Sequence, residues 1–302
     1  MEPTPATPRA APAATRGGWT PLHLAALLLA NLTLAMGPLL VRLADTGPVA
    51  AGFWRLTLAL PLILALSLRE PAPARRVRIG TLALVAGAGG FFALDLASWH
   101  IGIETTKLGN ASLFGNAGSL ILMAWGLIAA RRAPRLLEIA AIVAALAGAA
   151  LLMGGSLEIS HESFVGDLFC LLAGLFYAFY ILMLRPAREQ MGQFSVLLWS
   201  TLTGAPILLA IAVLRAEVLV PQDWTPLLLL ALSSQVVGQG LLIYSLKNFP
   251  PLVIGLALLT QPAISALTGW LAFGEVLSLG DVIGMVLLAA ALAMARAEDK
   301  PG

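Results

Sequence analysis

Ten apolar runs, each near the length that a helix needs to cross a bilayer, dominate the sequence. A hydrocarbon core of about 30 Å requires about 20 residues at a helical rise of about 1.5 Å per residue. Short connectors that combine charge with helix-breaking proline, such as RRAPR at 131–135, separate the runs. The pattern predicts an all-α polytopic membrane protein with ten transmembrane helices. They fall approximately at 20–42, 48–68, 79–101, 106–130, 135–154, 165–185, 192–214, 225–246, 251–273 and 280–296.

The composition supports this class. Of the 302 residues, 59% are hydrophobic and 11% are charged, which lies outside the usual range of soluble globular proteins. The single cysteine, Cys170, lies within an apolar run and has no second cysteine to pair with. Residues 1–18, rich in proline and alanine, read as a disordered cytoplasmic leader, and residues 297–302 read as a cytoplasmic tail.

The basic residues indicate the orientation of the chain. If the N-terminus is cytoplasmic, the inner connectors and termini carry 14 of the 18 Lys and Arg residues. The outer connectors carry three, Arg42, Lys107 and Arg215, and Arg55 falls inside a run. Because positive charge accumulates in cytoplasmic loops, both termini are predicted to be cytoplasmic.

An internal repeat divides the chain in two. Several residues recur at a separation of 145 positions: Trp54 with Trp199, Trp125 with Trp270, Pro61 with Pro206 and, as an aromatic exchange, Trp99 with Tyr244. A unit of this length contains five runs, an odd number, so the second copy must enter the membrane from the opposite side. The sequence therefore predicts two inverted five-helix repeats, at 20–154 and 165–296, with a substrate site where the halves meet.

Enzyme signatures are missing from the sequence. There is no HExxH motif, no phosphate-binding GxxxxGK followed by Ser or Thr, and no Cys/His cluster. His23, His100 and His161 lie on separate segments, and the basic residues form no single face. We expect a protein that is not an enzyme, uses no cofactor or metal and binds no nucleic acid.

Asp95 is the only carboxylate well inside a run. A charge at the bilayer centre costs roughly 3 kcal/mol on insertion scales, so it should face a cavity or a partner. Asp95 either lines a substrate cavity or serves helix packing in a hydrogen-bonded or protonated form. Trp99, four residues on, shares its face, whereas His100 lies about 140° away. We expect His100 and Glu104 to face solvent at the periplasmic end.

Other polar and aromatic residues within the runs complete the candidate site. With Asp95 and Trp99, the candidates for substrate binding are Asn31, Asn110, Tyr177, Tyr180, Gln235, Gln239, Tyr244 and Gln261. The candidates for gating through helix breaks are Pro38, Pro250, Pro251 and Pro262. Simpler roles remain open for these residues: the glutamines as bonds between helices, the tyrosines as core packing, Trp99 and Tyr244 as an interfacial belt, and the prolines as packing kinks.

The fifth and tenth runs are built almost wholly from Ala, Gly and Leu. Gly280 and Gly284 form a GxxxG spacing in the tenth, which permits close helix approach. These runs are predicted to make scaffold contacts or to form the contact of a homodimer, surrounded by membrane lipid.

One stretch carries a family resemblance. Residues 244–284, YSLKNFPPLVIGLALLTQPAISALTGWLAFGEVLSLGDVIG, resemble the drug/metabolite transporter superfamily, and SWHIGIETTKLGNASL at 98–113 is the first-half counterpart. The resemblance extends over both repeats as tandem EamA-type domains. Within that group the chain is similar to the YddG-type aromatic amino acid exporters. It departs from the pattern at Ala129-Ala130, where Gly-Glu is expected.

This resemblance implies a function and a helix arrangement. Helices 1, 3, 4, 6, 8 and 9 would surround a central cavity in a transporter of the bacterial inner membrane. Its substrates would be aromatic and other neutral amino acids, exported by alternating access. Export of drugs or other metabolites is the alternative, although the first run offers only Asn31 and Thr33 where small multidrug transporters use a glutamate. A scaffold or receptor without transport is a third class.

Overall fold

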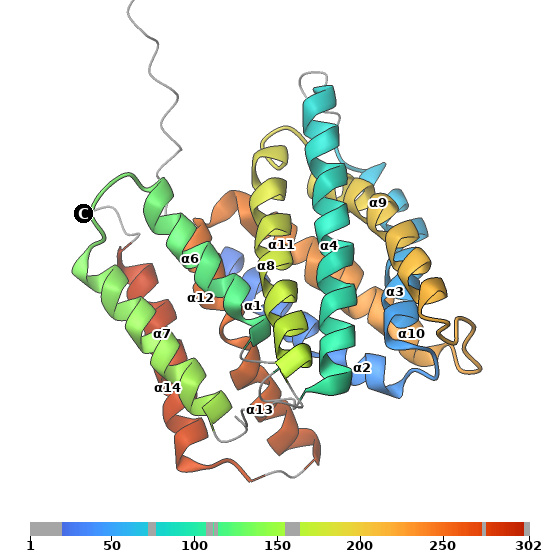
Figure 1. Ribbon diagram of the computed structural model, residues 1–302. Helices are drawn as coiled ribbons and strands as arrows, with labels where there is room; N and C mark the ends of the chain where they lie inside the picture. The colour runs from blue at the N-terminus through green and yellow to red at the C-terminus, as the bar shows by residue number, and fades with distance from the viewer. Residues whose placement is uncertain are drawn as a thin grey trace, which may run out of the picture.

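The computed structural model describes residues 20–71, 77–106, 111, 114–154, 164–273 and 276–298. Within these ranges every regular element is a helix, and the helices pack side by side (Figure 1). The fold is therefore all-α, as the sequence predicts.

The helices follow most of the apolar runs closely, but in the fourth run, predicted at 106–130, α6 begins only at Ala117. The first half contains α1 (Pro21–Ala35), α2 (Gly37–Leu43), α3 (Pro48–Ser67), α4 (Ile79–Thr105), α6 (Ala117–Ala129) and α7 (Leu136–Gly154). The second half contains α8 (Phe164–Ala187), α9 (Gln193–Leu214), α10 (Thr225–Leu230), the π-helix η1 (Ala231–Gln239), α11 (Gly240–Asn248), α12 (Pro251–Leu258), α13 (Gln261–Phe273) and α14 (Leu279–Glu298). The first run is interrupted at Met36 and the ninth at Leu259 and Thr260.

Six of the helical stretches in the described ranges are long and apolar enough to cross a membrane. They are Pro21–Leu43, Pro48–Ser67, Ile79–Thr105, Phe164–Ala187, Gln193–Leu214 and Thr225–Asn248. Four shorter apolar helices are Ala117–Ala129, Leu136–Leu152, Pro251–Ile264 and Leu279–Ala295. The count of ten crossings and the cytoplasmic placement of the termini stay predictions.

Several prolines begin helices rather than break them. Pro21, Pro38, Pro48 and Pro251 all occupy the first positions of a helix. A helix loses little there, because the first N–H groups have no intrahelical acceptor. Pro250 precedes α12 as its N-cap residue, so Pro250 and Pro251 mark the connector after α11.

Equivalent elements of the two halves contact each other: α3 packs on α9, α6 on α12 and α7 on α14. The α3 and α9 pair also exchanges helix caps. Glu70, just after α3, accepts hydrogen bonds from the backbone N–H groups of Phe194 and Ser195 at the start of α9. Glu217, just after α9, accepts one from Ala50 in the first turn of α3. The two helices therefore run in opposite directions, and each carboxylate stabilises the positive end of the other helix.

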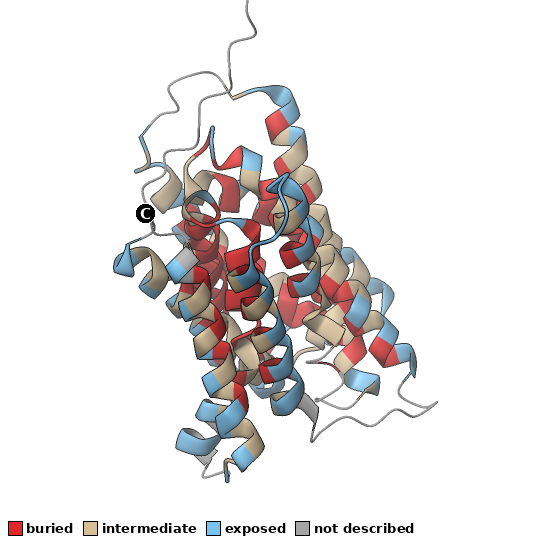
Figure 2. Ribbon diagram, turned by 90° about the vertical axis from the view of Figure 1, so that its left-hand side faces the viewer, coloured by how far each residue is buried: buried red, intermediate tan, exposed pale blue. Residues whose placement is uncertain are grey.

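The outer surface of the bundle is apolar. Buried residues concentrate on the inward faces of the helices and exposed residues on the outer faces (Figure 2). Trp125, Trp199 and Trp270, which belong to repeat-matched pairs, are 49%, 45% and 48% exposed. An outer face with this many large apolar side chains is typical of contact with lipid.

The fifth and tenth runs, α7 and α14, contact each other through glycine. A Cβ atom at Gly284 would lie 2.8 Å from the carbonyl oxygen of Gly148, and one at Gly148 would lie 2.7 Å from that of Gly284. At Gly280 the nearest atom to an added Cβ is the hydroxyl of Ser278, 3.5 Å away. Gly284 thus packs against another helix of the same chain. The homodimer stays a prediction.

This contact predicts different effects for two matched substitutions in α14. Gly284→Ala should separate α14 from α7 and lower the melting temperature by several degrees, because overpacking costs about 1–3 kcal/mol. Gly280→Ala should leave the melting temperature unchanged or raise it slightly, since alanine favours the helix. Thermal unfolding of both variants in detergent measures the difference. Equal melting temperatures would contradict the close contact.

Candidate functional site

A cavity of about 180 Å³ lies between the two halves of the chain. The first half contributes residues from α1, α2, α3, α4 and the segment before α6, and the second half contributes residues from α8, η1 and α13. Its lining comprises Leu34, Ala35, Gly37, Pro38, Val41, Arg55, Phe92, Asp95, Leu96, Trp99, His100, Ala111, Gly115, Asn116, Ala173, Tyr177, Gln239, Gln261 and Pro262.

Five of the substrate-binding candidates line this cavity: Asp95, Trp99, Tyr177, Gln239 and Gln261. Asp95 and Trp99 come from one face of α4, four residues apart as the helical period requires. A Cβ added to Gly115 would lie 3.4 Å from the Trp99 ring, so the glycine leaves room for the indole.

Two of the predicted helix breaks also reach the cavity. Pro38 follows the interruption at Met36, and Pro262 follows the interruption at Leu259 and Thr260. Both prolines lie beside an interruption of helical backbone hydrogen bonding. Such an interruption is tolerated in a membrane where the backbone borders a cavity.

Other candidates lie outside the lining because packing contacts occupy them. Asn31 is fully buried, and its amide donates a hydrogen bond to the carbonyl oxygen of Ala257 at 2.8 Å. Tyr180 is fully buried with its ring stacked on Phe92, 4.6 Å between centroids. Its hydroxyl lies 3.3 Å from Oε1 of Gln239 and donates to it. These two residues join helices rather than border the cavity.

Three further candidates within the described residues, Tyr244, Pro250 and Pro251, are also absent from the lining. Tyr244 lies near the end of α11, where its ring is 5.9 Å from that of His23. Pro250 and Pro251 stand at the connector before α12. Asn110 lies outside the described residues.

The two glutamines of η1 take different positions. Gln239 lines the cavity, whereas Gln235 is fully buried beside it. Oε1 of Gln235 accepts a hydrogen bond from Nε of Arg55 at 3.2 Å, and its amide donates to the hydroxyl of Thr201 at 3.1 Å. Gln235 therefore acts by holding Arg55. The π-helix that carries both glutamines is a rare geometry, frequent at functional sites.

Arg55 is the main residue that the sequence prediction missed. Arg55 belongs to α3, is 7% exposed and lines the cavity. Its charge is opposite to that of Asp95, which lines the same cavity. Its guanidinium carbon lies 5.6 Å from the centre of the Phe92 ring, within range of a cation–π interaction. The signal was present, because a lone arginine within an apolar run is as costly in lipid as Asp95.

His100 also differs from the expectation that it faces solvent. It is 2% exposed and lines the cavity, with its ring about 3.4 Å from the position of a Cβ on Gly52. Helix α4 continues to Thr105, so His100 is more than a turn from its end. Glu104, in the last turn, does reach the surface and pairs with Arg215 at 2.6 Å.

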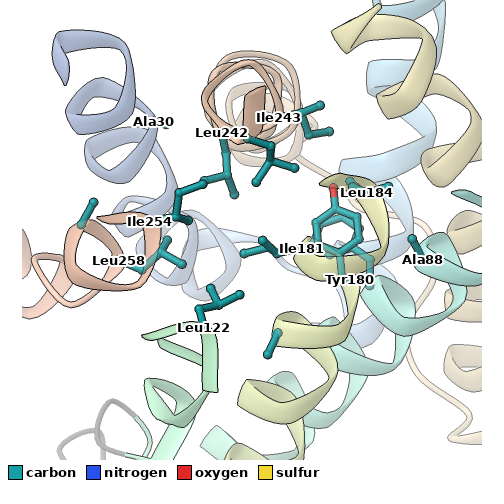
Figure 3. Close-up of a cluster of buried hydrophobic side chains, with 14 of the residues drawn as sticks. Ala30, Ala88, Leu122, Tyr180, Ile181, Leu184, Leu242, Ile243, Ile254 and Leu258 are labelled. Atoms are coloured by element: carbon teal, nitrogen blue, oxygen red, sulfur yellow. The ribbon is translucent and has the colours of Figure 1, made fainter. Parts of the chain in front are cut away.

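A cluster of buried, mainly apolar side chains lies outside the cavity lining, on helices that also carry lining residues. Figure 3 shows these side chains converging from both halves. We call this cluster the apolar plug, and none of its members is more than 2% exposed: Ala30, Ala88, Leu122, Tyr180, Ile181, Leu184, Leu242, Ile243, Ile254 and Leu258. Ala30 and Ala88 each precede the cavity residues of their own run, so the plug lies on the side where α1 and α4 begin.

Two proteins with sequences similar to this chain are both described as transporters. The chain is 27% identical over 266 residues to the threonine/homoserine exporter RhtA of Escherichia coli K12, covering 86% of the chain and 85% of the exporter. It is 23% identical over 271 residues to an uncharacterized transporter of Archaeoglobus fulgidus, covering 86% and 91%. A solved crystal structure matches its fold with a TM-score of 0.76 at 17% identity, over 93% of this chain and 99% of that one.

A family model matches the chain twice. The model of the EamA-like transporter family, within the drug/metabolite transporter superfamily, covers residues 22–154 and again residues 164–297. The family match and the apolar helices together identify the chain as a multi-pass protein of the inner membrane. Since the two matches span nearly all of the described residues, the chain belongs to the EamA-like transporter family.

Proposed function

We propose that this protein exports neutral amino acids, aromatic ones included, by alternating access through the cavity between its halves. The observation that carries the proposal is the cavity itself, which is lined by residues of both family-matched halves. A site shared by two halves can open to one side of a membrane or the other as the halves rock.

The size and chemistry of the cavity favour a small metabolite. Pockets for drug-sized ligands occupy about 300–1,000 Å³, whereas this cavity measures about 180 Å³. Phe92, Trp99 and Tyr177 offer aromatic surface to a substrate side chain, and Gln239 and Gln261 offer amides. A cationic drug would meet Asp95 but also Arg55, which repels it. The relationship to a threonine/homoserine exporter supports amino acids as the substrate class.

The packing of equivalent helices supports an inverted repeat. The antiparallel α3 and α9 pair, with its reciprocal glutamate caps, is what a two-fold axis in the membrane plane would produce. With both termini cytoplasmic, as the distribution of basic residues predicts, the apolar plug would lie on the cytoplasmic side of the cavity. We propose that the described conformation faces outward and that separation of the plug opens the cavity inward.

The function is tested by flux in proteoliposomes. The purified protein should mediate counterflow of radiolabelled L-threonine, L-homoserine, L-phenylalanine and L-tryptophan, because each fits a cavity with polar and aromatic walls. Empty liposomes and L-lysine serve as controls. If cationic dyes are transported and no amino acid is, the protein exports drugs; if neither moves, it does not transport these classes.

Trp99 should contribute to recognition of aromatic substrates. Trp99→Ala should raise the KM for L-phenylalanine several-fold more than the KM for L-threonine, since an aromatic pair contributes about 0.5–1.5 kcal/mol. Trp125→Ala, on the lipid-exposed surface, is the matched control and should change neither KM. Equal effects of Trp99→Ala on both substrates would assign Trp99 to packing alone.

Cysteine labelling in a Cys170→Ala background tests the outward-facing conformation. A membrane-impermeant maleimide should label Leu34→Cys, in the cavity lining, faster from outside than from inside. Leu258→Cys, in the apolar plug, should be labelled slowly from both sides. The exposed positions Glu189→Cys and Gln222→Cys report inside and outside access respectively. Rapid labelling of Leu258→Cys from the inside would refute closure by the plug.

A further inference from the structure

We propose that Arg55 and Asp95 form a two-point site for a zwitterion, in which Arg55 binds the substrate carboxylate and Asp95 binds the substrate ammonium group. The inference rests on the proposed function and names the groups that would recognise an amino acid. Both residues line one cavity, and they carry opposite charges.

Arg55 is held in place but is not saturated. Its Nε donates to Gln235, and Gln235 is in turn fixed by Thr201. The two terminal nitrogens of the guanidinium form no hydrogen bond within the described part of the chain, and neither is a buried unpartnered atom. They therefore reach the open space of the cavity. A guanidinium fixed by its Nε presents a fork of N–H donors that suits a carboxylate.

Asp95 is similarly available. Its carboxylate accepts no hydrogen bond from the residues that the structure describes, and it is partly exposed in the cavity. No ion pair within 4.0 Å joins it to Arg55 in that part of the chain. Two opposite charges that line one cavity without pairing with each other suit a molecule that carries the complementary pair.

A free amino acid carries that pair on one carbon atom. Its carboxylate on Arg55 and its ammonium on Asp95 would neutralise both charges at once, while its side chain meets Phe92, Trp99 and Tyr177. A substrate with one charge only would leave the other protein charge uncompensated away from bulk water, which is costly. The pair therefore selects zwitterions over amines, amides and simple acids.

Competition on the wild-type protein gives the first test. Counterflow of radiolabelled L-phenylalanine is measured against unlabelled L-phenylalanine, L-phenylalaninamide, which lacks the carboxylate, and 3-phenylpropionate, which lacks the ammonium. Each analogue should inhibit at least about tenfold more weakly than the amino acid, as expected for loss of a charged hydrogen bond. Comparable inhibition by all three would overturn the proposal while leaving amino acid transport intact.

Two variants that each remove one charge test which substrate group binds to Arg55 and which to Asp95. Arg55→Gln should lower affinity for L-phenylalanine at least about tenfold and reduce the preference for the amino acid over the amide. Asp95→Asn should lower affinity similarly and reduce the preference over 3-phenylpropionate. This crossed pattern separates ligand binding from a structural role, which would affect all three compounds equally. Arg42→Gln, an exposed arginine in α2, is the matched control and should behave as wild type.

The outcomes distinguish this inference from the proposed function. If the wild-type protein moves no amino acid, both fail. If it moves amino acids and both variants keep wild-type affinities, only the two-point site fails. Arg55→Lys, which keeps the charge but loses the fork, should retain part of the affinity, and size-exclusion profiles of all variants show whether the fold survives. If Arg55→Lys is folded but binds L-phenylalanine no more tightly than Arg55→Gln, the proposed binding of the carboxylate by the guanidinium fork is wrong.

Discussion

The hydrogen bond between Arg55 and Gln235 joins a buried charge of the first half to an amide of the second half. Within a membrane a guanidinium is costly unless protein groups or cavity water surround it. Here the Phe92 ring and Gln235 share that role, and Thr201 fixes Gln235. Phe92 in turn stacks on Tyr180, which donates to Gln239. One charge thus fixes the positions of side chains from several helices around the cavity.

The close contacts of the two halves complement this polar network. Without a hydrophobic driving force between helices in lipid, association depends on tight packing and on polar contacts. Gly148 and Gly284 provide the first between α7 and α14, and the reciprocal glutamate caps of α3 and α9 provide the second. None of these four residues lines the cavity, so their contacts can hold the halves together without occupying it.

The sequence predicted the helices better than it predicted the site. Apolar run length and proline-containing connectors located most of the helices within a few residues, because lipid demands continuous apolar helices. The helical period also placed Asp95 and Trp99 correctly on one face. It could not separate Gln235 from Gln239, since their roles depend on Arg55 of another helix. Nor could it show that Asn31 faces Ala257, a contact across 226 positions of sequence.

The charges of the cavity are not repeated in the second half. At the separation of 145 residues, Arg55 corresponds to Ser200 and Asp95 to Gly240. Ser200 donates to the carbonyl oxygen of Leu197 in its own helix, and Gly240 packs near the ring of Phe194. A fully symmetric cavity would hold two cations and two anions, a pattern that no single zwitterion could neutralise. Keeping one charge of each sign in one half matches a substrate that is itself asymmetric. The duplicated fold can thus supply the motion of two similar halves, while its divergence supplies the recognition.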